Sequence, residues 1–241
     1  MPKILMVKDS ADKFHKEMPL FDIPFKLLLN SKSQIGMGKT TIILNLLLSP
    51  HLGYADSFLG KNIFIVSNNK LDNKLKLLQD YKEIPDENIM EYDEQELTKL
   101  YADIEEKFIE EKEDKNIQNR IIIFDDVGYS GSLKNKNFGI ITKLVANARH
   151  VNLSQIYTAQ RFSMVSTNLR SNLTGACLGA TSMKELELIE NDFNYLNSKK
   201  EFIKMFREYT SEPRSFLCVN FTNKDGLYMD SEFNTIDTKD L

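Results

Sequence analysis

The 241-residue sequence predicts an α/β fold in which helices cover both faces of a mainly parallel central sheet. Short apolar segments alternate with longer segments of helical periodicity, which is typical of the strand–helix units that build such a sheet. The first apolar segment leads into a loop that ends in Gly38, Lys39 and Thr40, and the third ends in two adjacent acids, Asp125 and Asp126. Both features are expected at the carboxyl ends of strands, where the ligand crevices of open α/β sheets lie.

Five apolar segments are expected to form the strands. Their lengths suit strands, and each is apolar enough to be buried. They are residues 25–29, 62–67, 120–124, 154–158 and 176–180. The chain is expected to finish with a hairpin of residues 216–222 and 227–229 that turns near Asp225 and Gly226.

Capping signals predict where two of the helices begin. Asp93, with Glu96 three residues later, opens a helix with one apolar stripe. The stripe consists of Leu97, Leu100, Tyr101, Ile104 and Phe108. Ser182 and Glu185 have the same spacing before a later helix. The acidic residues 105–114 are interpreted as a solvated helix end without a function of its own.

Length and composition predict one soluble, intracellular domain. Residues 1–241 are expected to form a single domain, with a core at about 23–181 and a helix-and-hairpin extension at about 182–230. The net charge of -4 excludes a surface that is basic throughout, so any contact with nucleic acid requires a local loop or pore lining. Cys177 and Cys218 lie far apart in the sequence and indicate neither zinc nor a disulfide framework, which favours a reducing compartment. Neither a signal peptide nor a transmembrane segment is recognisable.

The loop after the first strand has the composition of a phosphate-binding loop. Glycines allow successive backbone N–H groups to face phosphate oxygens, Lys39 can reach the β- and γ-phosphates, and Thr40 can ligate Mg²⁺. The common pattern GxxxxGK(S/T) has glycine where this chain has Ser33. The alternative is a chance GKT in a surface turn, which the flanking strand and helix disfavour. The predicted nucleotide-binding residues are Ser33, Gln34, Ile35, Gly36, Met37, Gly38, Lys39, Thr40 and Thr41.

The two acids after the third strand are candidates for metal binding and base catalysis. We assign Asp125 to Mg²⁺ and Asp126 to the base that accepts a proton from the attacking water. Acids at this position can also cap a turn, and taken alone the two interpretations are equally good. Their coincidence with the GKT loop favours catalysis.

The fourth strand has a candidate catalytic residue near each end. Gln160 follows its carboxyl end, so we expect it beside Asp125 and the phosphates, where its amide can orient water or sense the γ-phosphate. Arg149 precedes its amino end, too far from its own nucleotide, and is expected to act on a neighbouring subunit's ATP as a trans arginine finger. A helix-end cation that interacts with the helix dipole is the alternative for Arg149. Arg170 is the next candidate for the finger.

Taken together, these motifs resemble the FtsK/HerA superfamily of DNA-pumping ATPases, and most closely the small genome-packaging ATPases of poxviruses, other large DNA viruses and virophages. The resemblance covers roughly residues 23–181. It rests on the GxGKT loop, the IIIFDD strand and the segment ARHxxLSxIYTAQRF, followed by Leu169-Arg170-Ser171-Asn172. The first two motifs are shared by many NTPases, whereas the arginine-to-glutamine segment is discriminating.

The resemblance implies a RecA-like P-loop NTPase of the ASCE type, with strand order 5-1-4-3-2. It further implies ATP and Mg²⁺ as cofactors, and translocation of double-stranded DNA into a preformed capsid. The implied assembly is a homo-oligomeric ring, pentameric or hexameric, docked on a capsid vertex protein without a membrane anchor in the chain. The expected location is the host cytoplasm or viral factory, with or without association with the virion. The chain has no room for a nuclease domain, so it is expected to pump DNA without cutting it.

DNA contact is expected in the loop of residues 128–137, because glycine and serine make it mobile and Lys134 and Lys136 can follow phosphates. An ordinary solvated loop is the alternative.

Three rival functions remain open. A cellular or plasmid-type DNA pump shares these motifs. A small-molecule P-loop kinase needs an arginine-rich lid, and the third rival is a nucleotide-dependent assembly module without turnover.

Overall fold

The computed structural model describes residues 20–32, 38–52, 54–69, 72–127, 139–222 and 227–238. These residues form one eight-stranded sheet with the order β3-β2-β4-β5-β1-β6-β7-β8. Pairings from β3 to β6 are parallel, and β7 and β8 are added antiparallel. The strands are β1 Lys26–Asn30, β2 Ile63–Ser67, β3 Ile89–Met90, β4 Arg120–Asp125, β5 Leu153–Ala159, β6 Gly175–Gly179, β7 Phe216–Asn220 and β8 Tyr228–Met229.

The predicted strand order is confirmed. The five strands expected from the sequence correspond to β1, β2, β4, β5 and β6, and in the sheet they lie in the order 5-1-4-3-2. The prediction missed β3, a two-residue strand at the edge next to β2. Such a short strand carries no periodicity from which it could be recognised.

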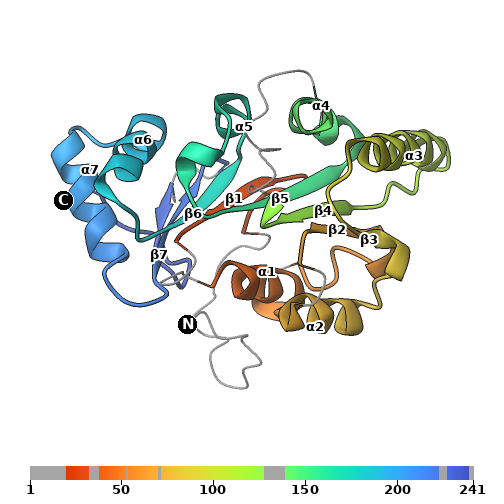
Figure 1. The fold of residues 1–241 in the computed structure, drawn as a ribbon, viewed down its shortest axis with the longest axis horizontal. Coiled ribbons are helices and arrows are strands. Elements are labelled where there is room, and N and C mark those ends of the chain that lie inside the picture. Colours follow the sequence, from red (N-terminus) through yellow and green to blue (C-terminus); the bar gives the residue numbers. More distant parts are fainter. Residues whose placement is uncertain are drawn as a thin grey trace.

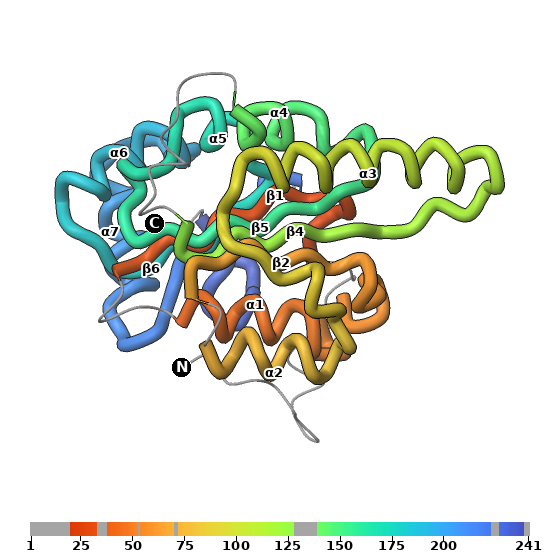
Figure 2. Tube along the Cα trace, turned by 45° about the vertical axis from the view of Figure 1, so that its right-hand side comes forward, coloured from red at the N-terminus to blue at the C-terminus, as the bar shows by residue number. Residues whose placement is uncertain are grey.

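Helices cover both faces of the sheet, so the molecule has three layers (Figure 1). One face carries α1 and α2, which lie side by side (Figure 2), and the other carries the remaining helices. The helices are α1 Lys39–Leu48, α2 Asn73–Lys82, α3 Glu94–Glu113, α4 Ile140–Asn147, α5 Thr167–Ser171, α6 Met183–Phe193 and α7 Lys199–Tyr209.

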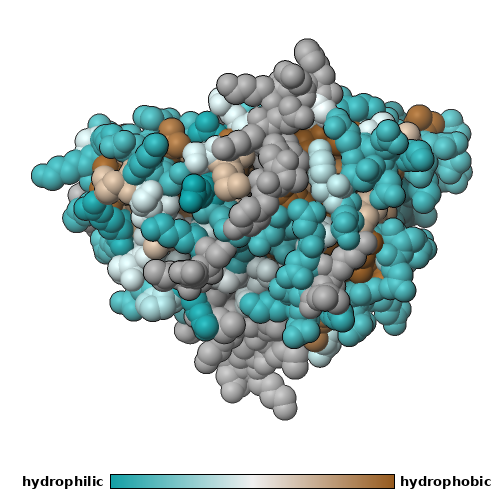
Figure 3. All heavy atoms as spheres, viewed as in Figure 1, coloured by the Kyte–Doolittle hydropathy of each residue, from teal (hydrophilic) through white to brown (hydrophobic). Residues whose placement is uncertain are grey.

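Alternate residues of each central strand pack into different cores. In β4, Ile121 and Ile123 face α1 and α2, whereas Ile122 and Phe124 face α3 and α4. Strands buried on both faces therefore read as continuous apolar runs, which is why the sequence showed them clearly. On the face shown in Figure 3 the side chains are mostly hydrophilic, with apolar ones in small scattered groups.

Both predicted helix starts are confirmed. The Asp93 carboxylate accepts hydrogen bonds from the backbone N–H groups of Gln95 and Glu96. The Ser182 hydroxyl accepts one from the backbone N–H of Glu185. The Glu185 carboxylate does not complete the capping box with Ser182; it accepts hydrogen bonds from the backbone N–H and the hydroxyl of Ser163, at 2.8 and 2.7 Å. This carboxylate therefore ties α6 to the segment that follows β5.

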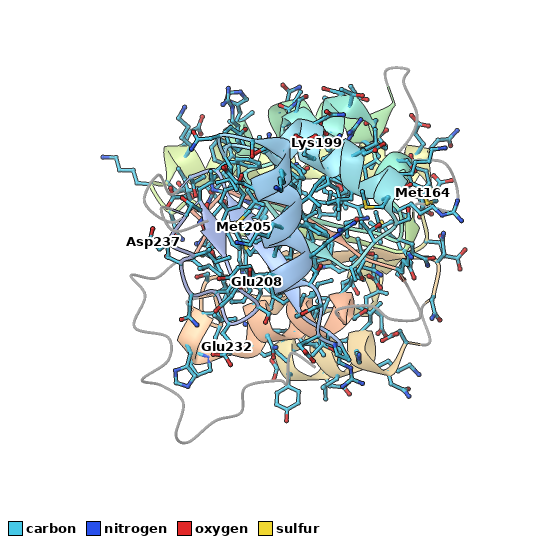
Figure 4. The ribbon with its side chains drawn as sticks, turned by 90° about the vertical axis from the view of Figure 1, so that its left-hand side faces the viewer. Met164, Lys199, Met205, Glu208, Glu232 and Asp237 are labelled. Carbon is cyan, nitrogen blue, oxygen red and sulfur yellow. The ribbon has the colours of Figure 1, made fainter. Side chains whose placement is uncertain are left out.

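The C-terminal extension contains two helices and the predicted hairpin. The hairpin is β7 with β8, and the predicted turn at Asp225 and Gly226 falls outside the described residues. Helix α7, which the sequence analysis did not identify, runs from Lys199 past the fully buried Met205 toward Glu208 (Figure 4).

The sheet brings the two cysteines together. Cys177 of β6 and Cys218 of β7 are direct cross-strand partners, and both are buried free thiols. Burial and the neighbouring Cys177 thiol raise the pKa of Cys218 well above its ordinary value. The sequence could not predict this proximity, because it depends on the pairing of β6 with β7 and not on the separation of the two cysteines along the chain. Among the described helices, none combines the length and the apolar character needed to cross a lipid bilayer.

Candidate nucleotide-binding site

Helix α1 begins at the carboxyl end of β1, on the loop that the sequence singled out. Gly38 precedes the helix with φ 73°, a left-handed conformation that glycine adopts without strain. The next residue, Lys39, turns its ammonium back toward β1 and donates to the backbone carbonyl of Ser31 at 3.2 Å. The predicted residues Ser33 to Met37 fall outside the described residues.

The start of α1 favours an anion. No acidic residue lies in its first turn, so the partial positive charge of the helix N-terminus is not neutralised from within the helix. Burial lowers the pKa of Lys39, while the negative charges of Asp126 and Asp125 oppose that shift. These acids are therefore close enough to Lys39 to act on it, although β5 separates their strands.

Asp125 and Asp126 are joined by a residue that the sequence analysis missed. The Thr158 hydroxyl of β5 donates to Asp125 Oδ1 at 3.0 Å and accepts the backbone N–H of Asp126 at 2.8 Å. Asp126 has φ 54°, a left-handed conformation in which Asp and Asn are enriched among non-glycine residues. The two carboxylates have different partners among the described residues, since Asp125 accepts from Thr158 and Asp126 accepts from Gln160.

The two carboxylates differ in burial. Asp125 is 7% exposed, whereas Asp126 is less buried. Burial raises the pKa of Asp125 to about 6, the Thr158 hydrogen bond opposes that rise, and the charges of Asp126 and Asp72 add to it. A buried carboxylate of raised pKa gains most from a cation, because the cation removes the cost of its charge.

Gln160 lies where it was expected, just beyond the end of β5. Its side-chain amide donates to Asp126 Oδ1 at 3.4 Å. Thr158 and Gln160 are two residues apart, and alternation along a strand places such residues on the same side. That spacing was the one sequence signal that could have identified Thr158.

Arg149 lies at the opposite edge of the sheet. It belongs to a short helical turn, Ala148–Val151, that precedes β5, and its side chain is exposed. Its Nε contacts only the adjacent His150, at 3.5 Å, among the described residues. This placement separates it from Lys39 of its own chain by the length of β5, as the sequence predicted.

Arg170 is held by neighbouring groups. Its guanidinium pairs with Asp192 of α6 at 2.5 Å and lies over the Phe162 ring, 4.8 Å from the ring centre. Arg170 and Asp192 line a pocket of about 790 Å³ together with Tyr195 and Phe221. An arginine with these contacts has less freedom to reach another subunit than Arg149 has.

The residues present fit a magnesium ion with a triphosphate. Mg²⁺ prefers oxygen ligands and usually binds through one or two carboxylates, a hydroxyl and the substrate phosphates. Thr40, at the start of α1, and Asp125 could provide the oxygen groups, and Lys39 could provide the cation for the phosphates. The proposed DNA-contact residues Lys134 and Lys136 lie outside the described part of the chain.

The fold and this edge of the sheet define a class. The sheet is parallel here, and a helix that follows a glycine begins at the end of β1. An acid pair lies two strands away at the end of β4, and a glutamine follows the strand between them. This arrangement defines a RecA-like P-loop ATPase. A family model described as Poxvirus A32 protein matches residues 11–239, so the chain belongs to the poxvirus A32 protein family. It is a viral packaging ATPase of the FtsK/HerA type.

Solved structures agree with this fold. The genome-packaging NTPase B204 of Sulfolobus turreted icosahedral virus 2, bound to ATP-gammaS, superimposes with a TM-score of 0.58 at 16% identity, over 88% of this chain and 98% of B204. The conjugation coupling protein TcpA of pCW3 gives a TM-score of 0.55 at 11% identity, over 95% of this chain and 70% of TcpA. EssC from Geobacillus thermodenitrificans gives a TM-score of 0.54 at 15% identity, over 89% of this chain and 41% of the EssC chain. No curated protein sequence matches the chain.

Proposed function

We propose that this protein hydrolyses ATP to drive double-stranded DNA into a preformed capsid. The observation that carries the proposal is the acid pair Asp125 and Asp126, which Thr158 joins and which lies close enough to Lys39 to alter its pKa. That geometry supports hydrolysis of a triphosphate, and membership of the poxvirus A32 family supports genome packaging as its purpose.

Each residue has a role that follows from its position. Lys39 and the N-terminus of α1 neutralise the phosphates. Asp126 accepts the proton of the attacking water, and the Gln160 amide, which contacts Asp126, orients that water. Thr40 and Asp125 would hold Mg²⁺, which when bound would supply positive charge against the phosphate oxygens. Thr158 is a positioning residue, because it acts through the two acids.

The proposed working unit is a ring of identical subunits. Arg149 is exposed at the edge of the sheet opposite the phosphate-binding edge, so it can complete only a site on another subunit. A ring, pentameric or hexameric, places one such edge against the nucleotide of the next subunit. Docking on a capsid vertex protein, in the cytoplasm or viral factory, belongs to the same proposal.

DNA contact is proposed for Lys134 and Lys136. Both follow the strand that carries the acid pair, so movement of that strand's end during hydrolysis can reach the DNA. Alanine at both positions should flatten the salt dependence of duplex binding, since fewer phosphates are neutralised, and leave DNA-free hydrolysis unchanged. An unaltered salt dependence would exclude this segment.

Steady-state phosphate release, measured with and without duplex DNA, tests the main proposal. A DNA-driven motor should hydrolyse ATP faster with duplex DNA, and Lys39→Ala should abolish both rates. A P-loop kinase would ignore duplex DNA and need a second small substrate. An assembly module would bind ATP and release no phosphate in either condition, which would refute the motor.

A further inference from the structure

Helix α2 places a lysine beside the nucleotide site, although no motif marks it. The Lys74 ammonium donates to the Thr41 hydroxyl of α1 at 2.8 Å. Both residues lie in the first turns of their helices, and α1 and α2 run side by side on one face of the sheet (Figure 2). Since both helices begin at the carboxyl edge, Lys74 and Lys39 flank the same helix start.

The position of Lys74 is electrostatically unfavourable without an anion. A cation in the first turn of a helix opposes the helix dipole. In the described parts of the chain, no carboxylate lies within ion-pair distance of its ammonium. The nearby Asp72 carboxylate is used as the cap of α2, where Oδ1 accepts the backbone N–H groups of Lys74 and Leu75 at 2.8 and 3.2 Å.

The first turn of α2 lies on the side of the metal-binding acid. Asp72 is near enough to Asp125 for its negative charge to contribute to the raised pKa of that carboxyl. Lys74 is two residues from Asp72, and its ammonium has three N–H donors. Among the described residues, the Thr41 hydroxyl accepts from one of them, which leaves two that could bind phosphate oxygens.

We propose that Lys74 is a second phosphate-binding cation of the nucleotide site, held by Thr41 and directed at the terminal phosphates on the metal side. The inference rests on the proposed nucleotide site, because it assigns a further residue to that site. Lys39 reaches the phosphates from the start of α1, whereas Lys74 reaches them from the neighbouring helix α2.

Binding of Mg·ATP, Mg·ADP and AMP to Lys74→Met by calorimetry tests the proposal. Methionine keeps an apolar stem of similar length and removes the charge. The expected loss is about tenfold for ATP, smaller for ADP and smallest for AMP, because a charge-assisted hydrogen bond to a terminal phosphate is lost. Lys74→Arg should keep most of the affinity. Lys76→Met, an exposed lysine on the same helix, is the matched control and should bind as the unaltered protein does.

Two outcomes would overturn the proposal. Unchanged ATP affinity in Lys74→Met would show that the lysine only joins α1 to α2. An equal loss for AMP and ATP would show that it does not face the terminal phosphates. Lys39→Ala keeps the tests distinct: if it abolishes ATP binding while Lys74→Met does not reduce it, the nucleotide site stands and only the role of Lys74 fails.

Discussion

The hydroxyl of Thr158 lies 3.0 Å from Oδ1 of Asp125 and 2.8 Å from the backbone nitrogen of Asp126. It donates to the first and accepts from the second, so one side chain of β5 fixes the geometry of both acids at the end of β4. Because β5 also leads to Gln160, two adjacent strands position both Asp126, the proposed base, and the glutamine that contacts it.

Thr158→Val should damage the site without changing its shape. Valine cannot accept from Asp126 or donate to Asp125, so the Asp126 amide is left without its partner, at a cost of about 1–3 kcal/mol in the free energy of unfolding. Turnover of Mg·ATP should fall roughly tenfold or more, since the side chain that orients Asp125, the proposed metal ligand, is lost. Thr158→Ser keeps the hydroxyl and should retain most of the stability and most of the turnover. Normal turnover in the valine variant would remove Thr158 from the mechanism.

Asp126→Asn should bind Mg·ATP normally and stop hydrolysis. Asparagine tolerates the left-handed backbone at this position, so the turn is preserved, but its amide cannot accept the proton of the attacking water. A loss of roughly 10²- to 10⁴-fold in turnover is expected, measured as phosphate release. Asp125→Asn should instead weaken the dependence on Mg²⁺. Hydrolysis by Asp126→Asn at the normal rate would transfer the role of base to Asp125 or Gln160.

Metal-dependent nucleotide binding should weaken as the pH falls through about 6. The pKa of Asp125 is raised to about 6, so protons compete with Mg²⁺ for this carboxylate below that pH. In the nucleotide-free protein, the native carboxyl holds its proton more tightly than the unfolded chain does. Its contribution to stability is therefore full at low pH and is lost as the pH rises through about 6. Titration of Mg·ATP affinity between about pH 5 and about pH 8 checks this, and Asp125→Asn should lose the pH dependence.

Arg149 should be required in trans. Arg149→Ala is expected to lose about 10³-fold or more in DNA-stimulated turnover, far more than loss of a helix-end cation would cause. Mixing Arg149→Ala with Lys39→Ala should restore part of the activity, because some interfaces then combine an intact Lys39 site with an intact Arg149. Mixed rings that remain inactive, or normal hydrolysis by Arg149→Ala alone, would assign the finger to another residue, with Arg170 the next candidate.

Glu111→Gln should destabilise the protein without affecting nucleotide binding. Arg120, at the start of β4, is 2% exposed, and its Nη1 donates to Glu111 Oε2 at 2.9 Å. Burial tends to raise the pKa of Glu111, but the Arg120 pair and the Gln118 amide outweigh it and lower that pKa. Removing the negative charge leaves a buried cation unpaired and should lower the free energy of unfolding by about 3 kcal/mol. In denaturant titrations the exposed neighbour Glu110→Gln should show no such loss.

The sequence by itself determined the fold class, the positions of the five principal strands and the candidate residues of the nucleotide site, whereas the order of those strands was implied by the family resemblance. Apolar periodicity, capping signals and the GKT and Asp125-Asp126 motifs are local, so neighbouring residues suffice to reveal them. The short strand β3 was missed, because two residues carry too little pattern.

Only the tertiary structure decided which distant side chains meet. Thr158 reaches Asp125 because β4 and β5 are parallel neighbours in a particular register, and Lys74 reaches Thr41 because α1 and α2 pack on the same face. The same holds for Cys177 and Cys218, which antiparallel pairing of β6 and β7 places opposite each other. Contacts of this kind depend on strand register and helix packing, which are set by the whole buried core, so no short stretch of sequence records them.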